Sequence, residues 1–208
     1  MNLSIQWIAF KTIISREVRR FLRIWVQTLV PPAITIALYF VIFGSLIGSR
    51  IGDMGGYDYM QFVVPGLIMM AVIQNSYGNV VSSFFGTKFQ GNIEELLVSP
   101  THEITILSGY VIGGVIRGLI VGAIVTILAL FFTRLDVQNW PVTISMVLLT
   151  AVVFALAGFI NAIFANNFDD ISIVPTFVLT PMIYLGGVFY STDLLPEFWA
   201  KVSMLNPV

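Results

Sequence analysis

Long apolar runs alternate with short polar segments along this chain of 208 residues. Five runs stand out: Val26–Ile47, Phe62–Phe85, Leu107–Phe132, Val142–Ala165 and Ile173–Tyr190. The hydrocarbon core of a bilayer is about 30 Å thick, so a helix needs about 20 mostly apolar residues to cross it. Because each run meets or nearly meets that length, we predict an all-α, polytopic membrane bundle with five spans.

Residues 1–25 predict a different element, an amphipathic helix in the membrane interface. On a helical wheel, one narrow face holds apolar side chains, which are Leu3, Trp7, Phe10, Ile14, Val18, Phe21 and Trp25. The opposite face is polar and cationic, with Lys11, Thr12, Ser15, Arg16, Arg19, Arg20 and Arg23. This division is typical of a helix that buries its aromatic side chains and turns its cations toward anionic headgroups. The alternative is a solvated basic flank.

The distribution of lysine and arginine predicts a cytoplasmic N-terminus. With that orientation, the cations on the inner side are Lys11, Arg16, Arg19, Arg20, Arg23 and Lys88. Only Arg50, Arg134 and Lys201 lie on the outer side, as the positive-inside rule requires. Segment 86–106 then forms a long cytoplasmic loop, and segment 191–208 is external.

Composition agrees with a membrane protein and excludes several other classes. Hydrophobic residues make up 57% of the chain and charged residues 10%, whereas a soluble domain usually carries about 25% charged residues. The net charge of −1 gives no indication of a nucleic-acid partner. The chain has no cysteine, which excludes disulfides and thiolate metal sites. Its single histidine, His102, supports neither a metal site nor a Ser-His-Asp triad.

The cytoplasmic loop is the most specific polar stretch. We expect Gly91 to end the second span, Asn92 to cap a short helix and Pro100 to stop that helix. Its first turn would carry two acidic residues, where the helix dipole favours negative charge, followed by apolar ones: Glu94, Glu95, Leu96, Leu97 and Val98. Such a helix suits a cytoplasmic partner, or it packs on its own protein; the residues leave both alternatives open.

This loop resembles the coupling region of the type-2 ATP-binding-cassette (ABC) exporter permeases. The resemblance is carried by Gly91, Glu94, Glu95, Leu96, Ser99, Pro100 and then Gly109. It extends over the rest of the chain, through Gly186-Gly187-Val-Phe-Tyr190, Leu195-Pro196 and the closing Asn206-Pro207. Members of that family usually have six spans, and two short helices before the sixth dip into the outer leaflet.

The resemblance implies that segment 191–208 is an external, re-entrant segment. A helical stripe in this segment is consistent with such a dip: Leu194, Leu195, Phe198, Val202 and Leu205. The chain stops where the sixth span would begin, so we expect that span to be missing, in a fragment or through an incomplete gene.

The resemblance also implies a bacterial inner-membrane protein in which transport and ATP hydrolysis belong to separate subunits. Two copies of the permease would work with two copies of a separate ATPase, and the coupling helix would dock in a groove of that ATPase. The chain has no Gly-x-x-x-x-Gly-Lys-Ser/Thr phosphate loop, so we expect no cofactor on this chain and ATP on the partner subunit. We therefore expect a transporter permease and not an enzyme, one that moves an amphiphilic, lipid-linked or drug-like substrate outward.

Arg117 is the one charged residue inside a predicted span, about ten residues into the third, or roughly 15 Å along its axis. An intramembrane arginine indicates a functional contact by default, but its long stem can also reach back to the surface. We favour a structural role, with Asp169 or Asp170 as a conceivable partner. A ladder of Gly114, Gly118 and Gly122 on the same span predicts close helix packing.

Two other function classes are weaker. An ion-coupled secondary transporter needs ionisable groups buried at the middle of the membrane, and Arg117 alone qualifies. A membrane-embedded enzyme needs clustered His, Asp or Glu, and the predicted spans contain no such cluster. The exporter permease is the leading interpretation, with the secondary transporter as the alternative.

Overall fold

The computed structural model describes residues 3–48, 53–54, 56–135, 137–191, 195–204 and 206. The described part is almost entirely helical, as the sequence predicted. Its helices are α1 (Leu3–Arg23), α2 (Trp25–Thr28), α3 (Val30–Tyr39), the π-helical η1 (Phe40–Ile47), α5 (Tyr59–Phe89), α6 (Asn92–Val98), α7 (Glu103–Ala129), α8 (Trp140–Phe164), α9 (Phe168–Val174), the π-helical η2 (Pro175–Leu179), α10 (Thr180–Leu185) and α11 (Glu197–Met204). Two short strands, β1 (Asp53–Met54) and β2 (Tyr57–Asp58), pair antiparallel.

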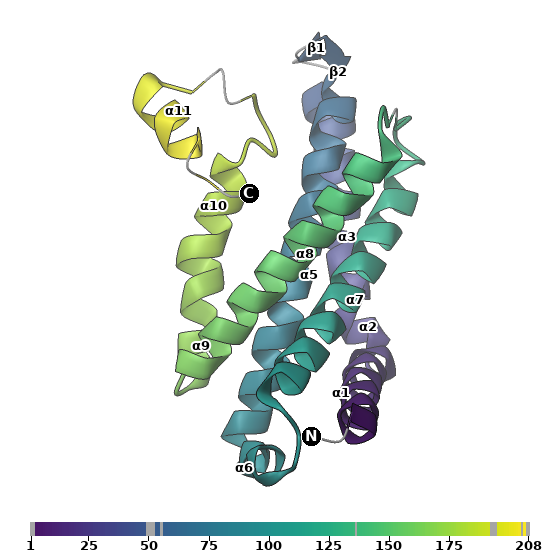
Figure 1. Cartoon of the computed structure of the whole chain (residues 1–208). Helices are drawn as coiled ribbons and strands as arrows, with labels where there is room; N and C mark the ends of the chain where they lie inside the picture. The colour runs from purple at the N-terminus through teal and green to yellow at the C-terminus, as the bar shows by residue number, and fades with distance from the viewer. Residues whose placement is uncertain are drawn as a thin grey trace.

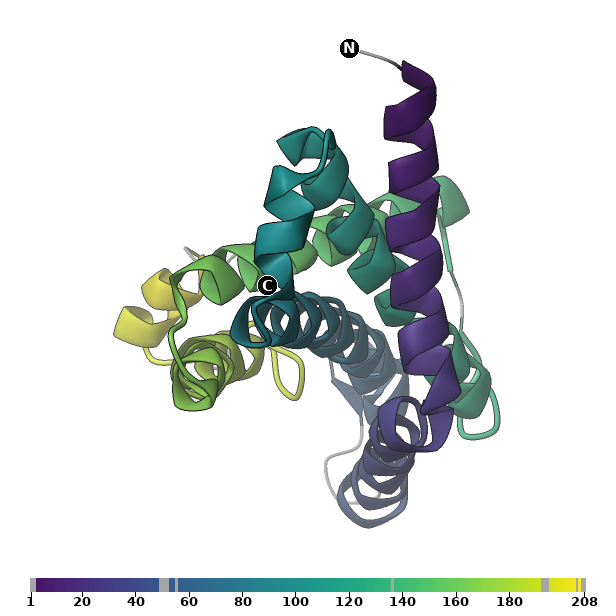
Figure 2. The ribbon, with the colours of Figure 1, turned by 90° about the horizontal axis from the view of Figure 1, so that it is seen from below.

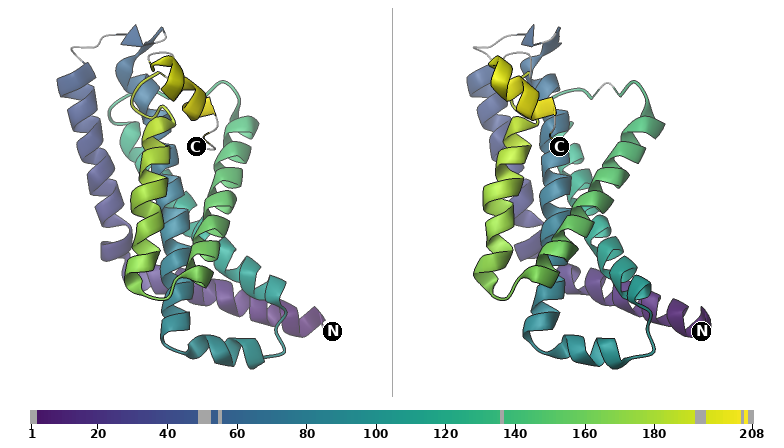
Figure 3. Two further views of the ribbon diagram at one scale, coloured as in Figure 1. Left: turned by 90° about the vertical axis from the view of Figure 1, so that its left-hand side faces the viewer. Right: turned by 60° about the vertical axis from the view of Figure 1, so that its left-hand side comes forward.

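The long helices run side by side around α5, and the short elements close the two ends of the bundle (Figure 1). The β1–β2 hairpin and α11 lie at one end, and α6 lies at the other. Helix α1 lies across the α6 end of the bundle, whereas the long helices run from that end to the other (Figure 3). Seen from that end, α1 runs along one side of the molecule, and the α9–α10 stretch lies on the other side of α5 (Figure 2).

Glycines let α7 and α8 approach the central helix closely. A Cβ atom at Gly118 of α7 would collide with Ser76 of α5, and one at Gly158 of α8 would lie 2.5 Å from the Tyr77 carbonyl oxygen. The predicted Gly114–Gly118–Gly122 ladder therefore faces α5 within the same chain, as small-residue ladders do in membrane bundles.

Four helical stretches of the described chain are long and apolar enough to cross a membrane. These are Trp25–Gly44, Glu103–Ala129, Trp140–Phe164 and Phe168–Leu185. The predicted span 62–85 lies within α5, which has the length but falls outside this set because Gln74, Asn75 and Asn79 interrupt its apolar run. Both Asn75 and Asn79 are buried against protein, where Asn75 Nδ2 donates to the Ala71 carbonyl oxygen at 2.9 Å and Asn79 Oδ1 accepts from Arg20 at 2.8 Å.

The last membrane stretch starts earlier than predicted. We expected a turn at 166–172 and a span at 173–190, but α9 begins at Phe168 and α10 ends at Leu185. Asn167 explains the early start, because its side chain accepts a 2.8 Å hydrogen bond from the Asp170 amide and caps the helix. The hydropathy pattern placed the start too late because this first turn is acidic.

The end of the chain folds back onto α10. Ser203 Oγ donates to the Leu185 carbonyl oxygen at 2.7 Å, and Asn206 Nδ2 donates to the Met182 carbonyl oxygen at 2.6 Å. Two residues of the predicted re-entrant stripe, Leu194 and Leu205, lie outside the described residues. The depth of segment 191–208 in the membrane stays a prediction.

Lys88, in the last turn of α5, connects this helix to the end of α8. Its Nζ donates to the carbonyl oxygens of Ile163 and Ala165, each at 2.7 Å. A cation at a helix C-terminus is favourable because carbonyl groups there have no partner within the helix. The point where α6 begins is thus attached to the point where α8 ends.

Candidate functional site: the coupling end of the bundle

Helix α6 forms where the sequence predicted a short helix. Gly91 adopts a left-handed conformation, with φ of +76°, and this lets the chain turn sharply out of α5. Gly91 itself is the N-cap residue, so our assignment of the cap to Asn92 is wrong; the Asn92 side chain instead donates to Gln90 Oε1. Ser99 is extended, as expected for a residue before proline, and Pro100 follows the helix.

One side of α6 faces the bundle and the other is free. Ile93 and Leu96 are partly buried against the core, whereas Glu94 and Glu95 are exposed. The apolar side chains that point outward are those of Leu97 and Val98, which are 65% and 84% exposed. Exposed apolar groups rimmed by polar side chains are one feature of surfaces that bind another protein.

The side chain of a single glutamine, Gln6, connects α1 to the backbone that follows α6. Gln6 Nε2 donates to the Pro100 carbonyl oxygen at 2.7 Å. Gln6 Oε1 accepts from the His102 amide and from Thr105 Oγ1, both at 2.9 Å. Sequence analysis missed Gln6, because nothing in its neighbourhood along the chain distinguishes it from an ordinary polar side chain.

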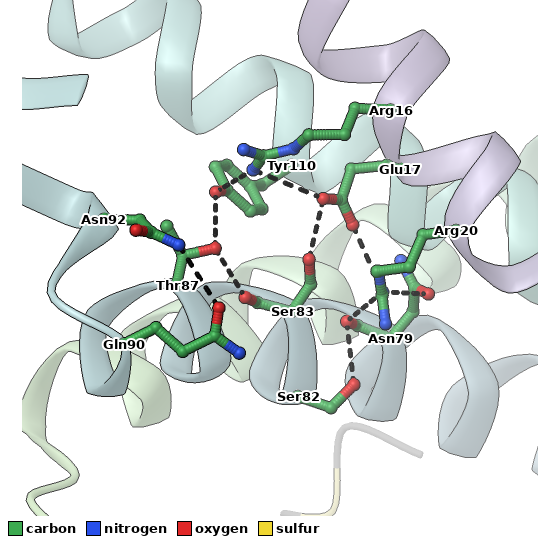
Figure 4. Close-up of polar contacts among 10 residues, drawn as sticks. All are labelled: Arg16, Glu17, Arg20, Asn79, Ser82, Ser83, Thr87, Gln90, Asn92 and Tyr110. Carbon is green, nitrogen blue, oxygen red and sulfur yellow. Dashed lines mark hydrogen bonds and ion pairs between the residues drawn. The ribbon is translucent and has the colours of Figure 1, made fainter. Parts of the chain in front are cut away.

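A buried polar cluster joins α1 to α5 and α7 at the same end of the bundle (Figure 4). At its centre, Glu17 is fully buried and accepts a 2.7 Å hydrogen bond from Ser83 Oγ. Its other carboxylate oxygen pairs with Arg20 Nη2 at 3.2 Å, and Arg20 also donates to Asn79 Oδ1 at 2.8 Å. The pairing matters because a buried carboxylate without partners is very costly.

Tyr110 extends this cluster onto α7. Arg16 donates to the Tyr110 hydroxyl, which also lies 3.2 Å from Thr87 Oγ1 of α5. Glu17 can lie so close to α7 because Gly113 has no side chain; a Cβ atom there would be 2.6 Å from Glu17 Cβ. Three helices therefore share one polar network.

The predicted apolar face of α1 is divided between two surroundings. Phe21 packs inside the protein together with Ile13, but Leu3, Trp7 and Trp25 are more than half exposed. Those exposed side chains are available to the membrane interface. Sequence analysis also missed Glu17, for which one signal exists: it is the only carboxylate among the cations of residues 1–25.

Arg117 has a different partner from the one we expected. Its Nη2 donates to the Thr28 carbonyl oxygen at 3.3 Å, and within the described residues no carboxylate forms an ion pair with it. Asp170 instead accepts a 2.8 Å hydrogen bond from the Asn166 amide within its own turn. The suggestion of Asp169 or Asp170 as partner is wrong, and the contact that does form is with a backbone carbonyl group. The structural role that we favour for Arg117 stays a prediction.

The described residues contain no group of three or more His, Cys, Asp or Glu side chains that could hold a metal ion. The arrangement at this end of the bundle therefore offers contacts for a protein or an anion and a rigid connection among α1, α5, α6 and α7.

Comparison with known proteins identifies the class of the whole chain. The chain is 62% identical over 206 residues to the inner membrane transport permease YadH of Escherichia coli (strain K12), a match that spans 99% of this chain and 80% of that protein. The protein of the same name from Shigella flexneri matches equally well. Nodulation protein J of Sinorhizobium fredii (strain NBRC 101917 / NGR234) is 24% identical over 169 residues, or 79% of this chain and 63% of that protein.

The sequence profile of the ABC-2 type transporter family matches residues 8–208. This range contains every helix described above, with α1 included from its second turn. The chain thus belongs to the ABC-2 type transporter family, as an integral inner-membrane permease subunit whose ATPase is a separate protein.

Proposed function

We propose that this permease subunit drives export, and that α6 is the element through which its ATPase acts. The observation that carries the proposal is the surface of α6. Glu94 and Glu95 are exposed there beside Leu97 and Val98, at the end of the bundle that we predict to be cytoplasmic. We infer that Gly91 and Pro100 set the two ends of this docking helix, and that Leu96 and Ser99 hold it in place.

The contacts around α6 support a role in transmission. Ser99 Oγ donates to the Leu96 carbonyl oxygen at 2.6 Å, and Gln6 holds the backbone that follows Pro100. A force applied to α6 is thereby passed to α1 as well as to α5 and α7. In this proposal, closure of the ATPase around ATP displaces α6 and so changes how the helices meet at this end.

We infer that the substrate is amphiphilic, lipid-linked or drug-like and moves outward, as the resemblance to exporter permeases implies. We further infer that two copies of the chain assemble with two ATPase copies. The exposed apolar face of α8 suits lipid or such a second copy, because its large side chains are uncovered: Val142, Ile144, Met146, Leu149 and Val153.

The test is a charge reversal on α6. The double variant Glu94→Lys/Glu95→Lys should lose binding to the ATPase by tenfold or more, or lose stimulation of ATP hydrolysis, because like charges across an interface oppose docking. Co-purification and ATPase assays in reconstituted membranes measure both. Glu197→Lys is the matched control, since it reverses an exposed acid on α11 at the opposite end. If the double variant still co-purifies with a stimulated ATPase and exports, the role of α6 is wrong.

The same preparation separates ATP-driven export from ion-coupled transport. Glu17 is a buried carboxylate, but it lies in α1, outside the predicted spans, and is paired with Arg20. An uncoupler added while ATP is kept constant should leave transport unchanged. Collapse of transport under that condition would support the ion-coupled alternative.

A further inference from the structure

A large cavity opens between α1 and the last turns of α5. Its volume is about 1060 Å³, near the upper end of the ~300–1,000 Å³ range of small-molecule sites. Five of the ten Lys and Arg residues of the chain line it: Lys11, Arg16, Arg19, Arg20 and Arg23. The cavity is thus strongly positive, and the coupling surface of α6 is not part of it.

Glu17 is the one carboxylate among the described residues that line the cavity, and it does not neutralise the positive charge near the cavity opening. Glu17 is fully buried and already paired with Arg20 at 3.2 Å and Arg16 at 3.7 Å, and it accepts from Ser83. Its effect is to hold two guanidinium groups in place at the base. Figure 4 shows Arg16 and Arg20 on either side of Glu17, with Arg16 directed toward Tyr110 of α7 and Arg20 toward Asn79 of α5.

The remaining cations are available. Arg19 and Arg23 are exposed, and neither forms an ion pair or a hydrogen bond with another described residue. Lys11 Nζ lies 4.9 Å from the centre of the Trp7 ring, and it forms no ion pair with a carboxylate among the described residues. Guanidinium groups match the oxygens of a phosphate in a bidentate manner, and several of them together favour a multiply charged group.

We propose that this cavity binds a phosphate group, either on the headgroup of an anionic lipid or on a soluble phosphate compound. The exposed Trp7 of α1 and Trp25 at the start of α2 suit a lipid at the membrane interface. The volume exceeds what one phosphate needs, so a diphosphate or a substituted headgroup also fits. The proposal concerns α1 and not α6, and it stands independently of the coupling role.

The experiment uses the purified full chain in a neutral detergent, without the ATPase. One arm adds phosphatidic acid or diacylglycerol, which differ by the phosphate, and counts retained lipid by native mass spectrometry. The other arm titrates sodium pyrophosphate and measures heat of binding. Retention of phosphatidic acid over diacylglycerol identifies a headgroup site, and binding of pyrophosphate alone identifies a soluble ligand. Either result should weaken as sodium chloride is raised.

The test variant is Arg19→Gln/Arg23→Gln, which removes two unpaired exposed charges and should leave the fold intact. We expect binding to fall at least tenfold in this variant. The matched control is Arg134→Gln/Lys201→Gln, which removes two exposed cations that do not line the cavity and should change binding less than twofold. Equal binding by both variants, no binding in either arm, or equal retention of diacylglycerol and phosphatidic acid together with no binding of pyrophosphate would overturn the proposal.

Discussion

Arg117 of α7 donates a hydrogen bond to the carbonyl oxygen of Thr28, across 3.3 Å, at the point where α2 gives way to α3. That carbonyl has no partner in its own helix, because the residues three and four positions later are Pro31 and Pro32, which lack an amide hydrogen. A buried carbonyl left unpaired is costly. The arginine therefore satisfies a group that the two prolines leave open, and it fixes the elbow between α1 and the first span.

Replacing Arg117 with methionine should loosen this elbow. The chain has no cysteine, so a single cysteine at Ile24, an exposed elbow position, can carry a spin label without background. We expect the label to become more mobile in Arg117→Met, with a loss of unfolding free energy of about 1–3 kcal/mol, typical of a hydrogen bond to a charged group. Arg134→Met is the control, and an unchanged spectrum in Arg117→Met would contradict the assignment.

Gln6 provides a way to separate ATPase binding from transmission. Gln6→Met removes three hydrogen bonds to the segment after α6 while leaving the surface of α6 unchanged. The ATPase should still bind with nearly the same affinity, but export per ATP hydrolysed should fall several-fold. Gln6→Glu keeps the oxygen that accepts from His102 and Thr105, and should lose less. Equal export ratios in both variants and the unmodified chain would count against Gln6.

The two leucines of α6 should behave differently although they are adjacent. Leu97→Asp places a charge on the exposed side and should weaken binding to the ATPase by about tenfold, or roughly 1.4 kcal/mol, without lowering the thermal stability of the isolated chain. Leu96→Asp places a charge against the core and should lower that stability. Thermal unfolding in detergent and pull-down of the ATPase distinguish the two. The opposite pattern would mean that the ATPase binds the side of α6 that carries Leu96.

Glu17 should matter more for stability than an exposed acid does. Glu17→Gln keeps an acceptor for Ser83 but removes the charge that Arg20 and Arg16 face. We expect a loss of about 1–2 kcal/mol, less than the roughly 3–5 kcal/mol of a fully buried pair because the two arginines are partly exposed. Glu197→Gln, in a surface pair with Lys201, should cost less than about 1 kcal/mol. Denaturation of both variants in the same detergent gives the comparison.

The spans and the short helix α6 could be predicted from sequence because single segments carry their signals. Apolar length predicts a span wherever it is uninterrupted, and Gly91 and Pro100 delimit α6 whatever packs around it. The acidic first turn of α9 and the polar residues of α5 show the limit of that argument. Hydropathy reports contact with lipid, whereas α5 is covered mostly by protein.

The polar contacts at the coupling end could not be predicted in the same way. Glu17 and Ser83 are 66 positions apart, and Arg117 and Thr28 are 89 apart, so only the packed bundle brings them together. Part of the Arg117 contact could have been anticipated, because Pro31 and Pro32 imply a carbonyl without a donor. By charge, a carboxylate is the more obvious partner for an arginine, whereas the group that Arg117 contacts is a backbone carbonyl oxygen.

Lys88 and Gln6 together give α6 a mechanical property that neither gives alone. Lys88 attaches the start of α6 to the end of α8, and Gln6 attaches the segment that follows α6 to α1. A helix that is attached at both ends resists tilting, whereas a helix attached at one end can tilt freely. Force on the middle of α6 is therefore transmitted to both points of attachment. We expect α1 and the α8–α9 corner, which lie on opposite sides of the molecule, to move together.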